Sequence, residues 1–318
     1  MSIEIVPYVE SYEATWEEFC AGAVNATILH TRGFLRYHGD RFKDMSVLIM
    51  ESGKLIGVFP AAESLSDPKQ VISHPGITYG GIVHHGWLSG LRILETLTAL
   101  SEFYRNAGYH RLQYKVLPHI YATTPSQDDL YALYRLNAKR VRCDLSCTID
   151  LAERKPLSER RRRGLKKAQK SVTLSSDPTL LGDLWAVIVQ NLARKHDSKP
   201  VHSLAELTLL KERFPEQIII RCALIDGRVE AGVLFFNSRA VWHAQYIAAS
   251  ENAYDVSALD AVFDGAITEA QQAGARYFDF GTSNEDGGKV LNDGLFRYKS
   301  EFGGGGIAHE YYELELGK

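Results

Sequence analysis

An order of predicted elements that occurs twice most constrains what this chain can fold into. Residues 45–62 contain two β-rich runs around Gly53, and residues 218–236 repeat this design around Gly227; glycine there permits a turn with positive φ. Each hairpin is followed by a strand candidate (residues 72–83 in the first case), a segment with helical period and another apolar strand. Both helical segments end on Ala-Gly, a common helix terminus. We therefore predict a mixed α/β (α+β) fold built from two copies of one unit.

The boundary between the copies is expected where charged residues and Pro156 follow the last strand of the first copy. We predict an N-terminal domain over residues 1–152 and a C-terminal domain over residues 153–318. The total length of 318 residues agrees with this division, because it exceeds what one hydrophobic core usually organises. Neither a GxGxxG motif after a first strand nor a GxxxxGK[ST] motif occurs, so dinucleotide and P-loop chemistry are poorly supported.

Charge and cysteine content narrow the class of protein. A net charge of −3 argues against a surface that is basic throughout, so a polyanionic partner would need a local patch. Four cysteines without a CxxC pair are too few for a disulfide scaffold and favour a reducing compartment. The N-terminus lacks the pattern of a secretory signal, and no apolar run is long enough to span a bilayer. We expect a cytoplasmic protein without an integral membrane segment.

The most concentrated charge lies in the segment SERRRRGLKKAQKS, which starts at Ser158 and is predicted to be helical. Like charges at helical spacing repel one another, which favours a bound phosphate. The alternative is a solvated helix whose cations pair with acidic neighbours. Aromatic residues are absent from the segment, so base stacking is not expected. The residues that we predict to bind substrate phosphate are Arg160, Arg163, Lys166 and Lys167.

A polar, glycine-rich segment follows the late apolar strand YFDFG. Loops on a rigid scaffold often carry catalytic groups, and we expect a long loop here that ends at residues 297–299. Lys299 would steady an oxyanion or a donor phosphate. The alternative is a surface ion pair of Lys299 with Glu301 or Asp293. Ser283, within the same segment, is a further candidate for substrate binding.

Several of these motifs together resemble the Fem-type aminoacyl transferases and their acyl-CoA-type relatives in the GNAT superfamily. The resemblance rests on the basic RRxxLKKA helix start, the strand YFDFG, the segment LNDGLFRYKSEFGGG and a terminal Tyr-rich strand. It covers nearly the whole chain, with the most specific motifs between residues 158 and 316. The resemblance implies two tandem GNAT-like domains, with acyl-CoA or aminoacyl-tRNA as the donor.

The resemblance also implies roles for particular residues. Lys299 matches the lysine of the family's Phe-Lys or Tyr-Lys pair, which is implicated in stabilising charge during transfer, and Tyr298 takes the place of its aromatic partner. Arg194 falls where the family has an arginine implicated in binding acceptor phosphate, with His196 and Lys199 close by in sequence. We therefore expect a catalytic site around Lys299 and an acceptor phosphate site around Arg194.

Further candidates lie in both halves. Arg36 lies near the family's N-terminal cation for the same acceptor. Tyr79, with His74, belongs to the glycine-rich segment SHPGITYGG, where a binding role competes with a plain glycine turn. His243 in VWHAQY is the candidate general base, because imidazole titrates near neutral pH; the alternative is a structural strand histidine.

Two motif comparisons bear on the donor and on the chemistry. The turn Q/R-x-x-G-x-G/A, with which ordinary GNAT enzymes hold the pyrophosphate of coenzyme A, is replaced by SENAYDVSALD. A helix start at Ser257 with Asp260 in a capping box is the remaining anion site there. No histidine or acidic cluster has metal-ligand spacing, so no metal is predicted. No GxSxG elbow occurs, so we expect direct transfer without a covalent enzyme intermediate.

The sequence thus predicts an N-acyltransferase that joins an acyl or aminoacyl group to an amine of an amino sugar or of a peptidoglycan or polysaccharide precursor. The predicted cations suit an acceptor linked to a nucleotide diphosphate or a lipid diphosphate, and tRNA is a further expected partner. The alternative is a non-catalytic module that binds phosphate or a nucleotide sugar on a degenerate GNAT pair. Nucleic-acid binding through the basic helix alone is the weakest interpretation, because the net charge is negative.

Overall fold

The computed structural model of the chain describes residues 3–196 and 200–317. It divides into two compact units: unit 1 comprises residues 1–144, 286–290 and 308–318, and unit 2 comprises residues 145–285 and 291–307. These units differ from the contiguous segments 1–152 and 153–318, because the last strand of the chain returns to unit 1, where it pairs with an earlier strand. The boundary after residue 152 stays a prediction about the duplicated sequence.

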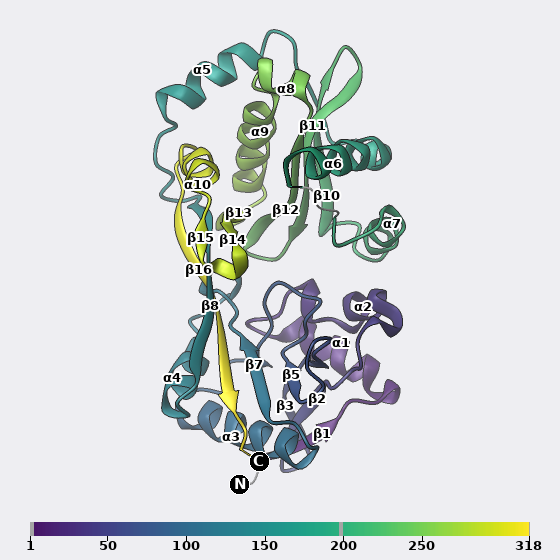
Figure 1. Ribbon diagram of the computed structural model, residues 1–318, viewed down its shortest axis with the longest axis vertical. Helices are drawn as coiled ribbons and strands as arrows, with labels where there is room; N and C mark the ends of the chain where they lie inside the picture. Colours follow the sequence, from purple (N-terminus) through teal and green to yellow (C-terminus); the bar gives the residue numbers. More distant parts are fainter. Residues whose placement is uncertain (1–2, 197–199, 318) are drawn as a thin grey trace. The chain divides into compact units, whose positions relative to one another are not determined.

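The described residues of unit 1 form two groups of strands and the helices α1 to α4 (Figure 1). One sheet has the order β1 (Ile3–Pro7), β2 (Val47–Glu51), β3 (Lys54–Phe59), β6 (Val83–His84). In the other group, β4 (Ala62–Glu63), β5 (Gln70–Ile72) and β7 (Arg111–Lys115) are neighbours, and β7 pairs with the last residues of β16 (Gly305–Glu315). The helices are α1 (Glu13–Gly22), α2 (Arg32–Leu35), α3 (Leu91–Asn106) and α4 (Asp128–Arg135), with 3-10 turns η1 (Glu10–Tyr12), η2 (Ile28–His30), η3 (Arg36–Arg41) and η4 (His119–Tyr121).

The strand candidate at residues 72–83 is strand only at its two ends, in β5 and β6. The residues between them wrap around Lys115, whose buried Nζ donates to the carbonyl oxygens of His74 at 3.0 Å and Ile77 at 2.6 Å. His74 has a φ of 56°, which extended strands do not adopt. Burial lowers the pKa of Lys115 to about 7. The strand prediction was wrong here because carbonyl groups of this segment accept hydrogen bonds from the buried Lys115 and not from a neighbouring strand.

Unit 2 is built on six strands in the order β8, β13, β12, β11, β10, β9. Their bounds are β8 (Lys139–Asp150, in unit 2 from residue 145), β9 (Thr173–Ser175), β10 (Ile218–Ile225), β11 (Arg228–Asn237), β12 (Val241–Ala249) and β13 (Tyr277–Thr282). The helices are α5 (Glu159–Ala168), α6 (Leu181–His196), α7 (Leu204–Arg213), α8 (Glu251–Asp255), α9 (Ala258–Gln272) and α10 (Asp293–Ser300). Short elements are η5 (Pro178–Leu180), β14 (Asn284–Glu285), η6 (Asp286–Gly288) and β15 (Val290–Leu291).

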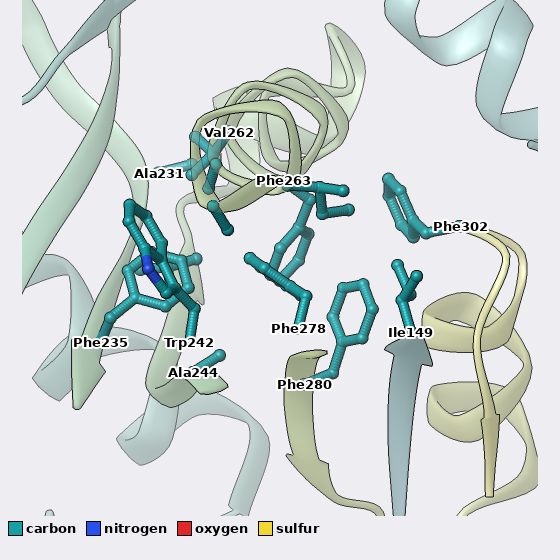
Figure 2. Close-up of a cluster of buried hydrophobic side chains, with 14 of the residues drawn as sticks. Ile149, Ala231, Phe235, Trp242, Ala244, Val262, Phe263, Phe278, Phe280 and Phe302 are labelled. Carbon is teal, nitrogen blue, oxygen red and sulfur yellow. The ribbon is translucent and has the colours of Figure 1, made fainter. Parts of the chain in front are cut away.

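Two helices cover opposite faces of the unit 2 sheet. Successive side chains of a strand point to opposite faces. On β11, Val233 and Phe235 belong to the core under α9, whereas a Cβ on Gly232 would meet Leu184 of α6. Figure 2 shows the aromatic core between α9 and the strands, including Phe263 of the helix. A polar side chain next to a core residue along one of these strands therefore lies on the other face of the sheet, which is the face that α6 contacts.

The duplicated turns predicted from the sequence are present. The hairpin turns at Ser52-Gly53 and Asp226-Gly227 have the same φ values, 50° and then 76°. The helices α3 and α9 each end before a glycine with positive φ, Gly108 at 89° and Gly274 at 79°. Only glycine adopts such φ values without a steric cost, which is why the two halves share these residues. The repeated order of hairpin, helix and strand is therefore a feature of the fold.

Candidate active site

The candidate site lies where two parallel strands of unit 2 separate. Pairing between β12 and β13 covers three residues of each strand and ends at His243 and Asp279. Beyond this point β12 continues to Ala249, whereas β13 bends at Gly281, whose φ is 74°. We call the place where the two strands part the fork. Backbone groups beyond the fork no longer pair between β12 and β13, so a ligand could bind there.

His243 and Asp279 form a hydrogen-bonded pair at the fork. His243 Nδ1 lies 2.7 Å from Asp279 Oδ2, and the two residues are 8% and 0% exposed. Their neighbours along the strands, including Trp242 and Phe278, point into the aromatic core, so the alternation of a strand turns both polar side chains to the opposite face. The pairing with a carboxylate fixes Nδ1 as the protonated nitrogen of the neutral ring. Nε2 is then the nitrogen that carries the lone pair.

Strand β8 supplies further donors to Asp279. Thr148 Oγ1 donates to Oδ1 at 2.9 Å, Ser146 Oγ donates to the same oxygen, and the amide of Gly281 lies 3.2 Å from it. Burying a carboxylate is costly unless its oxygens accept hydrogen bonds. Asp279 is therefore held in one orientation by groups from β8, β12 and β13.

Lys299 lies in helix α10 and not at the end of a long loop, so that expectation was wrong. Asn292 caps the helix by accepting the amide of Leu295 at 3.0 Å, which starts a regular turn. Lys299 is 3% exposed, and its Nζ donates to the carbonyl oxygens of Gly281 at 2.9 Å and Thr282 at 2.8 Å. Burial lowers its pKa to about 8, with Asp279 acting in the opposite direction. The surface ion pair considered for Lys299 is replaced by these carbonyl contacts.

Gly281 links the histidine pair to the lysine. Its amide donates to Asp279, and its carbonyl accepts from Lys299. A Cβ at this position would lie 3.3 Å from the carbonyl oxygen of Ala244 and 3.5 Å from His243 Cε1, in addition to the strain of a positive φ. The motif YFDFG thus ends on glycine because the backbone bends next to the histidine ring.

Tyr298, the other residue predicted to be catalytic, is engaged elsewhere in unit 2. Its hydroxyl donates to Asp260 Oδ1 at 3.0 Å, and the guanidinium of Arg161 lies 4.5 Å from its ring centre. Burial raises the pKa of the phenol. These contacts anchor α10 to α9 and α5, so the geometry of Tyr298 is that of a structural residue.

The predicted capping box of Ser257 and Asp260 does not form. Ser257 has a φ of 58° and makes no side-chain cap, and Asp260 instead binds Arg161, which also contacts Glu301 at 2.9 Å. A Cβ on Gly164 would lie 2.0 Å from Asp260 Oδ2, so only glycine allows this approach. Helix α5 therefore packs directly on the first turn of α9.

The other cations of α5 face solvent. Arg162 pairs with Glu159. Within residues 3–196 and 200–317, the remaining exposed cations of this helix form no ion pair; they are Arg160, Arg163, Lys166 and Lys167. We call these four residues the α5 cation stripe. The alternative that acidic neighbours neutralise the basic segment applies to Arg161 and Arg162 and not to the stripe.

Of the residues predicted around the acceptor phosphate, Arg194 is described in full. It lies on α6, where its Nη1 is 2.7 Å from Glu251 Oε1 at the start of α8. The side chain of His196 and the whole of Lys199 lie outside the described residues. The structure therefore places Arg194 beside the turn that leads into α9, and its role in phosphate binding stays a prediction.

The other candidates are spread over both units. In unit 1, Arg36 forms ion pairs with Glu10 and Glu13, and the ring of Tyr79 lies 4.4 Å from that of Tyr121. In unit 2, Ser283 is 2% exposed, and its backbone amide donates to the carbonyl of Leu145 at 3.0 Å. Of the three residues predicted to be catalytic, His243 and Lys299 are thus connected through Gly281, whereas Tyr298 contacts Asp260.

Sequence reasoning missed Asp279, Ser146 and Thr148. The signal that would have found them is strand alternation. Asp279 stands between two phenylalanines in YFDFG, and the two hydroxyl residues flank a core cysteine in LSCTI. A polar residue between two core residues of a buried strand points to the opposite face and needs a partner there.

Comparison with known proteins bears on the fold and on the class of enzyme. Residues 152–300 match the family model described as an acetyltransferase (GNAT) domain. The chain carries a GNAT acyltransferase domain. Its fold is similar to that of FemX, with a TM-score of 0.68 and 10% identity over 99% of this chain and 97% of that one. The family match supports the expected GNAT acyltransferase class, and the likeness to FemX shows that the two chains share a fold.

Two further solved structures share the fold over nearly the whole chain. L-PGS from Bacillus licheniformis has a TM-score of 0.62 and 14% identity over 98% of this chain and 93% of that one. A tandem GNAT protein from the clavulanic acid biosynthesis pathway has a TM-score of 0.54 and 10% identity over 100% and 99% of the two chains. The predicted tandem GNAT architecture is confirmed. Among curated proteins, none matches this sequence significantly.

Two properties of the described part of the chain bear on partners. Every helix there is too short or too polar to cross a bilayer. Among residues 3–196 and 200–317, no group of three or more His, Cys, Asp or Glu side chains is arranged to hold a metal ion.

Proposed function

We propose that this acyltransferase transfers an acyl or aminoacyl group directly to a substrate amine at the fork. The observation that carries the proposal is the His243–Asp279 pair, which lies beside a glycine whose carbonyl binds Lys299. A histidine oriented by a buried carboxylate is a suitable general base near neutral pH. His243 would remove a proton from the acceptor amine, and Lys299 would stabilise the negative charge that develops on the donor carbonyl.

In the proposed step, the acceptor nitrogen attacks the carbonyl carbon of the donor and a C–N bond forms. His243 Nε2 takes the proton that the nitrogen loses. The C–S or C–O bond of the donor then breaks, and His243 returns the proton to the leaving thiolate or alkoxide. No covalent bond to the enzyme is required.

Lys299 would stabilise the oxyanion that develops on the donor carbonyl. An ammonium group has three N–H donors, and two of them are used by Gly281 and Thr282. The third is left for a substrate oxygen. A charged hydrogen-bond donor stabilises an oxyanion more strongly in a buried site than in water, because water there does not screen the charge.

We propose that the donor carries phosphate groups, as acyl-CoA and aminoacyl-tRNA both do. What supports this is the α5 cation stripe, which has no acidic partner in the described structure and lies on a helix packed against the first turn of α9. The proposed acceptor is an amino sugar or a peptide or polysaccharide precursor linked to a nucleotide or lipid diphosphate. Four thiols without a disulfide support a reducing, cytoplasmic location.

A donor and acceptor screen tests the proposal. Purified protein is incubated with nucleotide-linked amino sugars and either a mixture of acyl-CoAs or a pool of charged tRNA, and N-acylated products are measured by mass spectrometry. We expect product with one donor class, and we expect His243→Gln to reduce kcat by about 100-fold or more. Equal product from wild type and His243→Gln would contradict the general-base role. Binding of acceptor without product from either donor would support the non-catalytic alternative.

A further inference from the structure

We propose that Ser146 and Thr148 of β8 are positioning residues for the His243–Asp279 pair, an inference that rests on the function proposed above. Both hydroxyls donate to Asp279 Oδ1, at 2.9 Å in the case of Thr148. The other carboxylate oxygen, Oδ2, lies 2.7 Å from His243 Nδ1. The two hydroxyls thereby engage one oxygen of the carboxylate and leave the other for the histidine.

Strand register explains why these two residues reach the carboxylate. Thr148 pairs directly with Asp279 across the antiparallel strands β8 and β13, so their side chains lie on the same face. Ser146 is two residues earlier and points to that face as well. Cys147 between them belongs to the aromatic core on the opposite face. The pattern Ser-Cys-Thr therefore presents two hydroxyl groups to one buried carboxylate.

The two hydroxyls restrict the orientation of the carboxylate as well as satisfying its acceptor sites. Asp279 already receives the amide of Gly281 at 3.2 Å and the ring nitrogen of His243. The additional hydroxyls come from a neighbouring strand and restrict rotation of the carboxylate, because both converge on Oδ1. A carboxylate that cannot rotate holds the imidazole in one orientation and one tautomer, with the lone pair on Nε2. This is the state that a general base for an amine requires.

The hydroxyls also affect the charge that the histidine experiences. Each O–H dipole points its hydrogen at Asp279 and offsets part of the negative potential at the imidazole ring. Removing one hydroxyl leaves more of the negative charge of the carboxylate facing the ring. We therefore expect such a variant to need a higher pH for activity. A purely structural role for the hydroxyls would leave this pH dependence unchanged.

Threonine-to-valine substitution tests the proposal, because it removes the hydroxyl at nearly constant volume. We expect Thr148→Val to lower kcat about tenfold with little change in KM, and to move the acidic limb of the kcat/KM profile to higher pH. Thr148→Ser, which keeps the hydroxyl, should restore both. The matched control is Thr96→Val, since Thr96 is fully buried in α3 of unit 1 and its hydroxyl donates to a backbone carbonyl at 2.7 Å. This control should lose stability without a shift of the profile.

An unchanged kcat and pH profile in Thr148→Val, with a loss of thermal stability like that of Thr96→Val, would overturn the proposal. If Thr148→Val fails to fold, Ser146→Ala carries the same expectation for the profile. A measurement that needs no substrate separates this inference from the proposed function. The ¹H–¹⁵N NMR signals of the His243 ring should show the Nδ1–H tautomer in wild type and in Thr148→Ser. A tautomer that stays the same in folded Thr148→Val and Ser146→Ala would refute the positioning role even if no substrate were found.

Discussion

At the scale of the residue, the environment of Lys299 decides what its amine can do. The side chain is buried among backbone carbonyls and close to Asp279, so its pKa falls to about 8 but not into the acid range. At pH 7 the amine is therefore mostly charged and can stabilise an oxyanion. The sequence predicted the importance of this lysine from a family motif. It did not predict the carbonyl contacts, which depend on the return of α10 to the end of β13.

The pH dependence of activity follows from this lowered pKa. The pKa of the protein group is about 8, so charge on Lys299 is present below pH 8 and is lost as the pH rises through that value. We expect kcat/KM to fall above about pH 8 in the wild-type enzyme. Lys299→Met, which keeps the chain length and removes the charge, should lower kcat about 100-fold or more and abolish this limb. A profile of kcat/KM from pH 6 to 10 for both proteins checks this. Wild-type turnover in Lys299→Met would contradict the catalytic role.

At the scale of the element, helix α5 combines two faces with different tasks. Arg161 and Gly164 attach the helix to Asp260 in α9, and the cation stripe faces solvent. The amino-acid sequence shows six cations within eight positions but not which of them is buried. At helical spacing, the six cations are distributed around nearly the whole circumference of α5. The buried face can therefore be told from the exposed face only when the tertiary partner of one of these residues is known.

The stripe makes a testable contribution to donor binding. We expect the double variant Arg163→Glu/Lys167→Glu to raise the KM of the phosphate-bearing donor at least tenfold and to weaken its dependence on salt. Thermal stability should change little, because both residues are exposed and unpaired in the described structure. The control Lys54→Glu/Lys139→Glu reverses two exposed charges in unit 1 and gives the same net charge. Equal effects of the two double variants on KM would show that only net charge matters.

At the scale of the whole molecule, stability also depends on titratable groups that do not belong to the fork. In unit 1, Asp129 accepts the hydroxyl of Tyr114 at 3.0 Å, and desolvation raises the pKa of the carboxyl to about 6 from a usual value of 3.8. The folded state therefore binds a proton more tightly than the unfolded chain does. By linkage, the free energy of unfolding falls as the pH rises between about 4 and 6.

Replacing this carboxylate tests the linkage. Asp129→Asn keeps an acceptor for Tyr114 and removes the charge. We expect the variant to be more stable than wild type at pH 8, by on the order of 2 kcal/mol, and to show no such gain at pH 4. Denaturant unfolding at the two pH values measures this difference. An equal change at both pH values would mean that the charge of Asp129 does not cost stability.

The sequence by itself determined the elements that local patterns specify. Hairpin turns at Gly53 and Gly227 and the helix ends at Gly108 and Gly274 follow from residues that tolerate positive φ, so they could be read without the fold. The basic helix and the family motif around Lys299 were also recognisable. These features depend on neighbours in the sequence or on residue identity alone.

Only the tertiary structure decided how the site is assembled. Ser146, His243 and Asp279 are far apart in the sequence and meet because β8, β13 and β12 are adjacent strands in register. Residues 73–82 do not form a strand, because some of their carbonyl groups accept hydrogen bonds from the buried Lys115. Such outcomes depend on which groups share a low-dielectric interior, where every polar atom needs a partner, and sequence spacing does not contain that information.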